Sequence, residues 1–260
     1  MLRGMFEMLM PVQHALPLSA QFPNGTQFPN GTQLPALPAL PAAAVTAFLV
    51  AAFAVAGAAV GWLGRCALCR LPRGAVVPPG WCEVGGAALW SAVAVRMADG
   101  LPPWWSVVPL ALGSLAVPLA ACDALAGRLP DALTLPLWPA AALVLAFAAC
   151  WGDAPALLVR APLGTALFAG TYSLVRRVRP RSLGRGDVKL AGGLGAVVGA
   201  VSLSAVLWTI FAAAVLTVLV AGVARARVVA HGPAMLAPAW FVTASASAPA
   251  LHTGLGWPAR

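Results

Sequence analysis

Two aspartates, Asp123 and Asp187, stand where long apolar segments meet basic loops. A carboxylate at the mouth of a membrane helix is costly, so such a residue points to a functional site. Two carboxylates held close together cannot both ionise readily, and one of them then keeps a proton near neutral pH. The ionised acid can take a proton from water, while the protonated acid polarises a peptide carbonyl and then protonates the leaving amine. This is the chemistry of an aspartyl protease, which needs neither a metal nor a cofactor.

The chain has seven acidic residues, and the other five have simpler interpretations. Glu83 and Asp131 stand at the starts of predicted helices, where a negative charge is favourable. Three more fall in the N-terminal head or in loops on the opposite side of the predicted membrane domain: Glu7, Asp99 and Asp153. For Asp123 and Asp187 two alternatives stay open, which are an ion-translocation pair and two separate helix-terminal acids.

Composition sets the class of protein in which these acids must work. Of the 260 residues, 61% are apolar and 9% are charged, and the mean hydropathy is +0.87. A soluble domain carries about 25% charged residues, so the sequence predicts an all-α, polytopic membrane protein. The net charge of +9 does not indicate nucleic-acid binding, because the basic residues lie in short loops, as expected for contact with anionic lipid headgroups.

The apolar segments predict about eight transmembrane helices. They lie at residues 42–63, 84–95, 104–122, 132–151, 156–175, 188–200, 204–224 and 234–248. The run 188–217 is too long for one span, and we divide it near 200–204 because glycines, which let helices approach closely, crowd its first part. Arg160, near the start of the fifth helix, is expected to snorkel to the interface.

The basic residues predict the orientation of these helices. Twelve of the 16 fall in the loops after the first, third, fifth and seventh helices: Arg65, Arg70, Arg73, Arg128, Arg176, Arg177, Arg179, Arg181, Arg185, Lys189, Arg225 and Arg227. By the positive-inside rule these loops are cytoplasmic, and both termini lie outside. Asp123 and Asp187 then lie on the same, cytoplasmic, side of the membrane, where they can meet.

The N-terminal part divides the chain into predicted domains. Residues 1–41 form a Pro-rich head with a repeated Gln-Phe-Pro-Asn-Gly-Thr unit, and this density of turn residues predicts disorder. A first helix and a cytoplasmic loop follow at 42–83. The membrane domain that holds both acids is expected at 84–250, and a short tail at 251–260.

Five cysteines do not make a closed set of disulfides. Cys66 and Cys69 form one C-x-x-C pair, and Cys82 is a lone third thiol, whereas a structural zinc site normally takes four ligands. We interpret the three as free thiols of a cytoplasmic loop, with a zinc site as the alternative. Cys122 and Cys150 are interpreted as small packing residues.

The sequence around each acid resembles a signature block of a known family. The two blocks are Asp123-x4-Arg128-Leu129-Pro130-Asp131 and Gly184-x-Gly186-Asp187-Val188-Lys189-Leu190. Together and in this order they resemble the signatures of the type IV prepilin leader peptidases, the A24 family of GxGD-type membrane aspartyl proteases. His231-Gly232-Pro233 is similar to the start of the family's C-terminal helix, and the likeness covers residues 84–248.

The resemblance implies a multi-pass endopeptidase of the inner (cytoplasmic) membrane that acts without a cofactor. Such enzymes cut the short basic leader from prepilins and pseudopilins at the cytoplasmic side, so the implied partners are these substrates and the lipid bilayer. Asp123 and Asp187 match the catalytic pair. The implied supporting residues are Arg128 and Asp131 in the loop, Gly184 and Gly186 beside an extended substrate, and Lys189, which either lowers the pKa of Asp187 or meets a lipid headgroup.

This sequence departs from the family pattern in one respect. Larger members carry an N-terminal cytoplasmic domain with two C-x-x-C pairs and also methylate the new N-terminus. Here that region shrinks to residues 65–81 with one pair, so the chain resembles the short form of actinobacterial and tight-adherence pilus systems, and the likeness does not extend to the methyltransferase activity.

Two other classes of function stay open. One is a small membrane transporter that uses Asp123 and Asp187 as ion ligands, and the other is a catalytically dead membrane scaffold. The block that ends at Asp131 favours the peptidase, because a transporter has no evident need for it.

Overall fold

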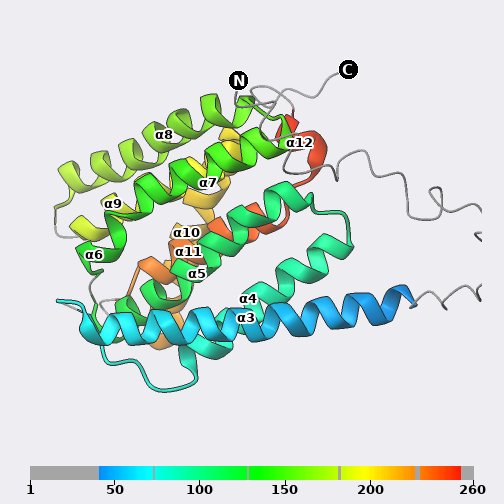
Figure 1. Ribbon diagram of the computed structural model, residues 1–260. Helices are drawn as coiled ribbons and strands as arrows, with labels where there is room; N and C mark the ends of the chain where they lie inside the picture. Colours follow the sequence, from blue (N-terminus) through cyan, green and yellow to red (C-terminus); the bar gives the residue numbers. More distant parts are fainter. Residues whose placement is uncertain (1–40, 73, 128, 181–182, 226–228, 253–260) are drawn as a thin grey trace, which may run out of the picture. The chain divides into compact units, whose positions relative to one another are not determined.

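The computed structural model describes residues 41–72, 74–127, 129–180, 183–225 and 229–252. The described residues contain helices and no strand, which confirms the all-α prediction. The helices, shown in Figure 1, are α3 (Ala42–Arg70), α4 (Trp81–Ala98), α5 (Pro103–Ala126), α6 (Asp131–Thr134), α7 (Leu137–Gly152), α8 (Ala156–Val178), α9 (Arg185–Val201), α10 (Leu203–Ala224), α11 (Gly232–Ala244) and α12 (Ala248–His252). Two compact units divide the chain after Ala42, and the helices described here build the second, Ala43–Arg260. The predicted disordered head lies, up to residue 40, outside the described residues.

Among the described helices, four stretches are long and apolar enough to cross a membrane. They are Ala43–Arg70, Pro103–Ala126, Asp131–Gly152 and Leu203–Ala224. The chain is therefore a helical membrane protein, but the expectation of about eight spans is wrong. Helices α9 and α11 have only 17 and 13 residues, fewer than the ~20 that cross a bilayer, and α4 and α8 are less apolar.

Helix α9 is short and is enclosed by other helices. It contacts α7, α8, α10 and α11, and every residue from Leu190 to Val201 except Ala196 is buried. It ends where Ser202 adopts an extended conformation and its hydroxyl accepts the amide of Ala205 at 3.0 Å, which caps α10. The predicted division of this run is confirmed.

Glycines allow the backbones of neighbouring helices to touch. Gly164 of α8 faces Gly195 and Gly199 of α9, and a Cβ at Gly164 would lie 2.5 Å from the Cα of Gly199. Gly57 of α3 faces Gly86 of α4 in the same way. Small residues are the usual means by which helices pack closely in lipid, where apolar burial gives no driving force.

Arg160 does not snorkel to the interface as expected. Its side chain is 1% exposed, and its guanidinium donates to the carbonyls of Val201 at 3.1 Å, Ala250 at 3.0 Å and Leu251 at 2.6 Å. These carbonyls belong to the last turns of α9 and α12, where backbone oxygens lack partners within the helix. The buried cation therefore joins the C-terminal ends of two helices.

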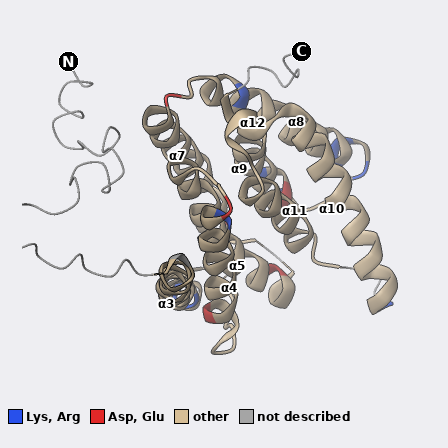
Figure 2. Cartoon of the chain, turned by 90° about the vertical axis from the view of Figure 1, so that its right-hand side faces the viewer, with Lys and Arg blue, Asp and Glu red and all other residues tan. Residues whose placement is uncertain are grey.

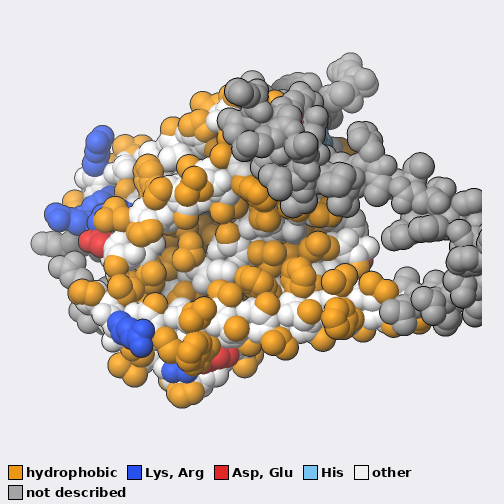
Figure 3. Space-filling model, in the orientation of Figure 1, with side chains coloured by type: hydrophobic (Ala, Val, Ile, Leu, Met, Phe, Trp, Pro, Cys, Tyr) orange, Lys and Arg blue, Asp and Glu red, His pale blue; other side chains and the backbone are white. Residues whose placement is uncertain are grey.

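Charged residues are few, and many of the basic ones lie at one end of the helices. Long stretches of the helices carry no charge (Figure 2). On the face shown in Figure 3 the lysine and arginine side chains gather at the left-hand end, where α3 ends and α9 begins in Figure 1. This gathering agrees with the predicted placement of the basic loops on one side.

We predict that Gly164→Ala destabilises the protein, because its Cβ would meet the backbone of α9. The free energy of unfolding should fall by about 1–3 kcal/mol, as for other overpacked cores. Gly170→Ala on the same helix is the matched control, because nothing lies within 4 Å of a Cβ there. Thermal unfolding in detergent checks this, and equal stability of the two variants would contradict the close contact.

Candidate active site

Asp123 lies in the last turn of α5 and is 6% exposed. Its Oδ2 accepts the backbone N–H of Gly232, the first residue of α11, at 2.8 Å. The carboxylate thus caps the start of another helix, where free amides and the helix dipole favour a negative charge. Helix α5 ends at Ala126. Gly127 follows it with a φ of 59°, and its backbone N–H donates a hydrogen bond to the Asp123 carbonyl at 2.8 Å.

Asp187 lies in the first turn of α9, outside the four candidate spans. Its Oδ2 accepts the N–H of Gly184, the residue that precedes the helix, at 3.0 Å. Burial raises the pKa of Asp187 to about 6; the negative charge of Asp123 also raises it, whereas the Gly184 amide and Arg176 lower it. A pKa near 6 means that the protonated form of Asp187 is favoured below that pH.

The two predicted acids belong to one electrostatic cluster. The influence of Asp123 on Asp187 requires proximity, and the fold provides it, because α11 contacts both α5 and α9. Each carboxylate is held by a glycine amide at the start of a helix. The negative charge of Asp123 thus favours the protonated form of Asp187.

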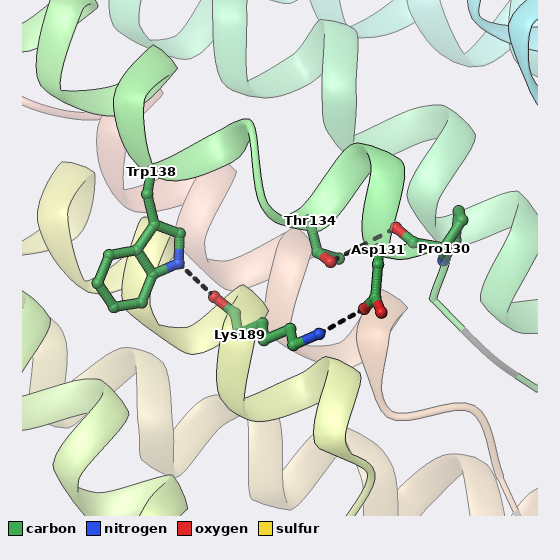
Figure 4. Close-up of polar contacts among 5 residues, drawn as sticks. All are labelled: Pro130, Asp131, Thr134, Trp138 and Lys189. Carbon is green, nitrogen blue, oxygen red and sulfur yellow. Dashed lines mark hydrogen bonds and ion pairs between the residues drawn. The ribbon is translucent and has the colours of Figure 1, made fainter. Parts of the chain in front are cut away.

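Lys189 and Asp131 form an ion pair that joins the two sequence blocks (Figure 4). The ammonium of Lys189 lies 2.6 Å from Oδ1 of Asp131, and the indole N–H of Trp138 donates to the Lys189 carbonyl at 2.8 Å. Asp131 is the first residue of α6, as its interpretation as a helix-start acid predicted. The sequence suggests two roles for Lys189, which are lowering the pKa of Asp187 and binding a lipid headgroup. An ion pair with Asp131 is neither of these.

The glycines of the second block lie against the first block. A Cβ at Gly186 would lie 3.0 Å from the Cβ of Leu129, and a Cβ at Gly184 would lie 3.0 Å from Oδ2 of Asp187. Both positions thus leave no spare room for a side chain. Arg128, the remaining predicted supporting residue, lies outside the described residues.

Sequence reasoning missed Tyr172 and gave His231 no chemical role. The Tyr172 hydroxyl lies 2.9 Å from Nε2 of His231, and Nδ1 of His231 lies 2.7 Å from the hydroxyl of Thr217. Tyr172 also lies within electrostatic range of Asp187, and His231 within range of Asp123. One signal was present in the sequence, because Tyr172 is the only tyrosine of the chain.

The described residues hold no group of three or more His, Cys, Asp and Glu side chains that could bind a metal ion. Cys66 and Cys69 lie on α3, which is longer than predicted and includes part of the expected loop, and Cys82 is buried on α4. Glu83 accepts the N–H of Gly80 at 3.0 Å and the Arg65 guanidinium at 2.7 Å. Its interpretation as a helix-start acid is confirmed.

Comparison with known proteins gives one match. Residues 110–222 match the family model described as the type IV leader peptidase family. The matched stretch includes both acids and the ion pair of Asp131 with Lys189, and it ends before His231. No curated protein and no solved structure matches the chain.

We predict energetic coupling between Lys189 and Asp131. Both side chains are partly exposed (35% and 47%), so the pair should contribute about 0.2–1 kcal/mol. Lys189→Glu or Asp131→Lys alone should lower the free energy of unfolding, and the double swap should recover most of the loss. A double-mutant cycle in detergent measures this; purely additive losses would contradict the contact.

Proposed function

We propose that this chain, whose residues 110–222 match the type IV leader peptidase family, is a membrane aspartyl endopeptidase of that family with Asp123 and Asp187 as its catalytic pair. The substrates are prepilins or pseudopilins, from which it removes the basic leader. The observation that carries this proposal is the electrostatic coupling of the two acids, each held by a glycine amide at a helix start. Both acids fall within the matched residues.

The two carboxylates divide the acid and base roles. Asp187, whose pKa burial raises to about 6, is the acid that protonates the leaving amine. Asp123 is the base that takes a proton from the attacking water. Oδ2 of each acid accepts a backbone amide, so we assign the proton transfers to the two Oδ1 atoms.

The neighbouring residues hold the segments around the two acids in place. The ion pair of Lys189 with Asp131 fixes the connection between α5 and α6 beside the first turn of α9, where Asp187 lies. Gly186 lies against Leu129 without a side chain between them. We assign Gly184, Gly186 and Arg128 to the approach of an extended substrate.

The reaction takes place at the cytoplasmic side of the inner membrane. The support for this placement is the gathering of basic side chains at one end of the visible face (Figure 3), because basic loops stay on the cytoplasmic side. A basic leader would reach the two acids from there, and the apolar helix that follows it would remain in the bilayer.

We expect Asp123→Asn and Asp187→Asn each to abolish leader removal, because each takes away one proton-transfer group. A loss of at least ~10²-fold is expected for such a group. Co-expression with a candidate prepilin and a gel-shift assay measures cleavage. Asp153→Asn is the matched control, since Asp153 ends α7 with a φ of 48°, a conformation that asparagine adopts readily.

These variants also separate the alternative functions. Full cleavage by both Asn variants would overturn the aspartyl mechanism. A wild-type chain that cleaves no prepilin but moves ions in vesicles, with loss of transport in both variants, would establish the transporter.

We further expect kcat/KM to fall as the pH rises through about 6, because Asp187 then loses the proton that the leaving amine needs. With a pKa of about 6, Asp187 is almost fully protonated only well below pH 6. Cleavage of a purified prepilin between pH 5 and 8 tests this. Asp131→Asn should keep the same profile, and a flat wild-type profile would contradict the assignment.

A further inference from the structure

The hydrogen bonds around a neutral His231 have one direction that agrees with the bond of the Thr217 hydroxyl to Ala213. The Thr217 hydroxyl donates to the carbonyl of Ala213 at 2.8 Å, so towards His231 it can only accept. Nδ1 of His231, at 2.7 Å, must therefore carry the hydrogen. In a neutral ring Nε2 is then an acceptor, and it receives the Tyr172 hydroxyl at 2.9 Å.

The neutral form of the ring agrees with its surroundings. Burial lowers the pKa of His231, and the negative charge of Asp123 opposes this shift only in part. The titratable groups that face this region are Asp123 from α5, Asp187 from α9 and Tyr172 from α8, while α10 contributes the hydroxyl of Thr217. The ring of Tyr172 also packs on the imidazole, with centroids 5.6 Å apart.

The hydrogen bonds that link Thr217, His231 and Tyr172 lie next to the Gly232 amide, which donates to Asp123. His231 directly precedes Gly232, whose N–H bonds to Asp123. Gly232 has no side chain of its own to fix its orientation, and a Cβ there would lie 2.8 Å from Oδ2 of Asp123. The His231 carbonyl belongs to the same peptide group as this amide and accepts the N–H of Met235 at 3.1 Å. The His231 side chain adds a second restraint on this peptide group, because its two ring nitrogens are tied to α8 and α10.

We propose that His231 is a positioning residue: Tyr172 and Thr217 fix its neutral ring from two helices, and the fixed ring aims the Gly232 amide at Asp123. Its role is exerted through Asp123 and rests on the proposed protease function. The Tyr172 hydroxyl also lies within electrostatic range of Asp187. In this arrangement the hydroxyl donates its hydrogen to Nε2 of His231.

The test uses the full chain in detergent and a purified prepilin. Thr217→Val removes the acceptor of His231, and Tyr172→Phe removes its donor. Each should lower kcat at least about tenfold with little change in KM, since a small misplacement of a catalytic group can cost ~10²-fold. Thr217→Ser keeps the hydroxyl and should retain the wild-type rate.

Thr209→Val is the matched control for Thr217→Val. Thr209 also lies on α10, is buried, and donates to the carbonyl four residues earlier at 2.8 Å. A general loss of packing would slow both variants alike, and this result would overturn the positioning role. Thermal unfolding of all variants shows whether each one folds.

A second readout does not depend on activity. Hydrogen–deuterium exchange of the peptide that contains Gly232 should be faster in Thr217→Val than in wild type or Thr209→Val. Wild-type cleavage or unchanged exchange in Thr217→Val, while Asp123→Asn is inactive, would overturn the inference and leave the protease intact. If Asp123→Asn cleaves normally, the proposed function fails, and the exchange result alone then decides the positioning role.

Discussion

The hydrogen bond from the Gly232 amide to Asp123 is the interaction on which the site depends. A carboxylate that is 6% exposed needs a donor, because an unpaired buried charge is very costly. The start of a helix supplies such a donor and adds the favourable field of its dipole. Only glycine fits at this position, so the start of α11 must lie where it does, against the end of α5.

Asp187 follows the same design at the start of α9. Its donor is the amide of Gly184, which comes from its own chain segment rather than from a distant helix. Both acids are therefore held by backbone N–H groups. Helix α9 in turn is fixed by its burial among α7, α8, α10 and α11, so the position of Asp187 is a property of the core.

The acids could be predicted from the sequence because their chemistry is local. A charge at the end of an apolar run is conspicuous, and the residues beside Asp123 and Asp187 form compact blocks. The helix break after Val201 was predictable for the same reason. The hydrogen bond between Tyr172 and His231 was not predictable, because it joins α8 to the start of α11 across 59 residues of sequence.

The number of spans and the place of Arg160 were mispredicted for a related physical reason. Apolar runs reveal that a helix avoids water, but they do not distinguish a lipid neighbour from a protein neighbour. Helix α9 is surrounded by protein and needs no full membrane length. Arg160 is likewise solvated by carbonyls of α9 and α12, which a reading that assumes lipid around α8 could not foresee.

The buried guanidinium of Arg160 also sets an order of assembly. Residue 160 is synthesised well before Ala250 and Leu251, which provide two of its acceptors. Until the last described helix has been made, the cation lacks these carbonyls and the end of the bundle cannot close around it. The C-terminal segment therefore completes the solvation of a charge that lies near the middle of the chain, and the core on that side closes late in biosynthesis.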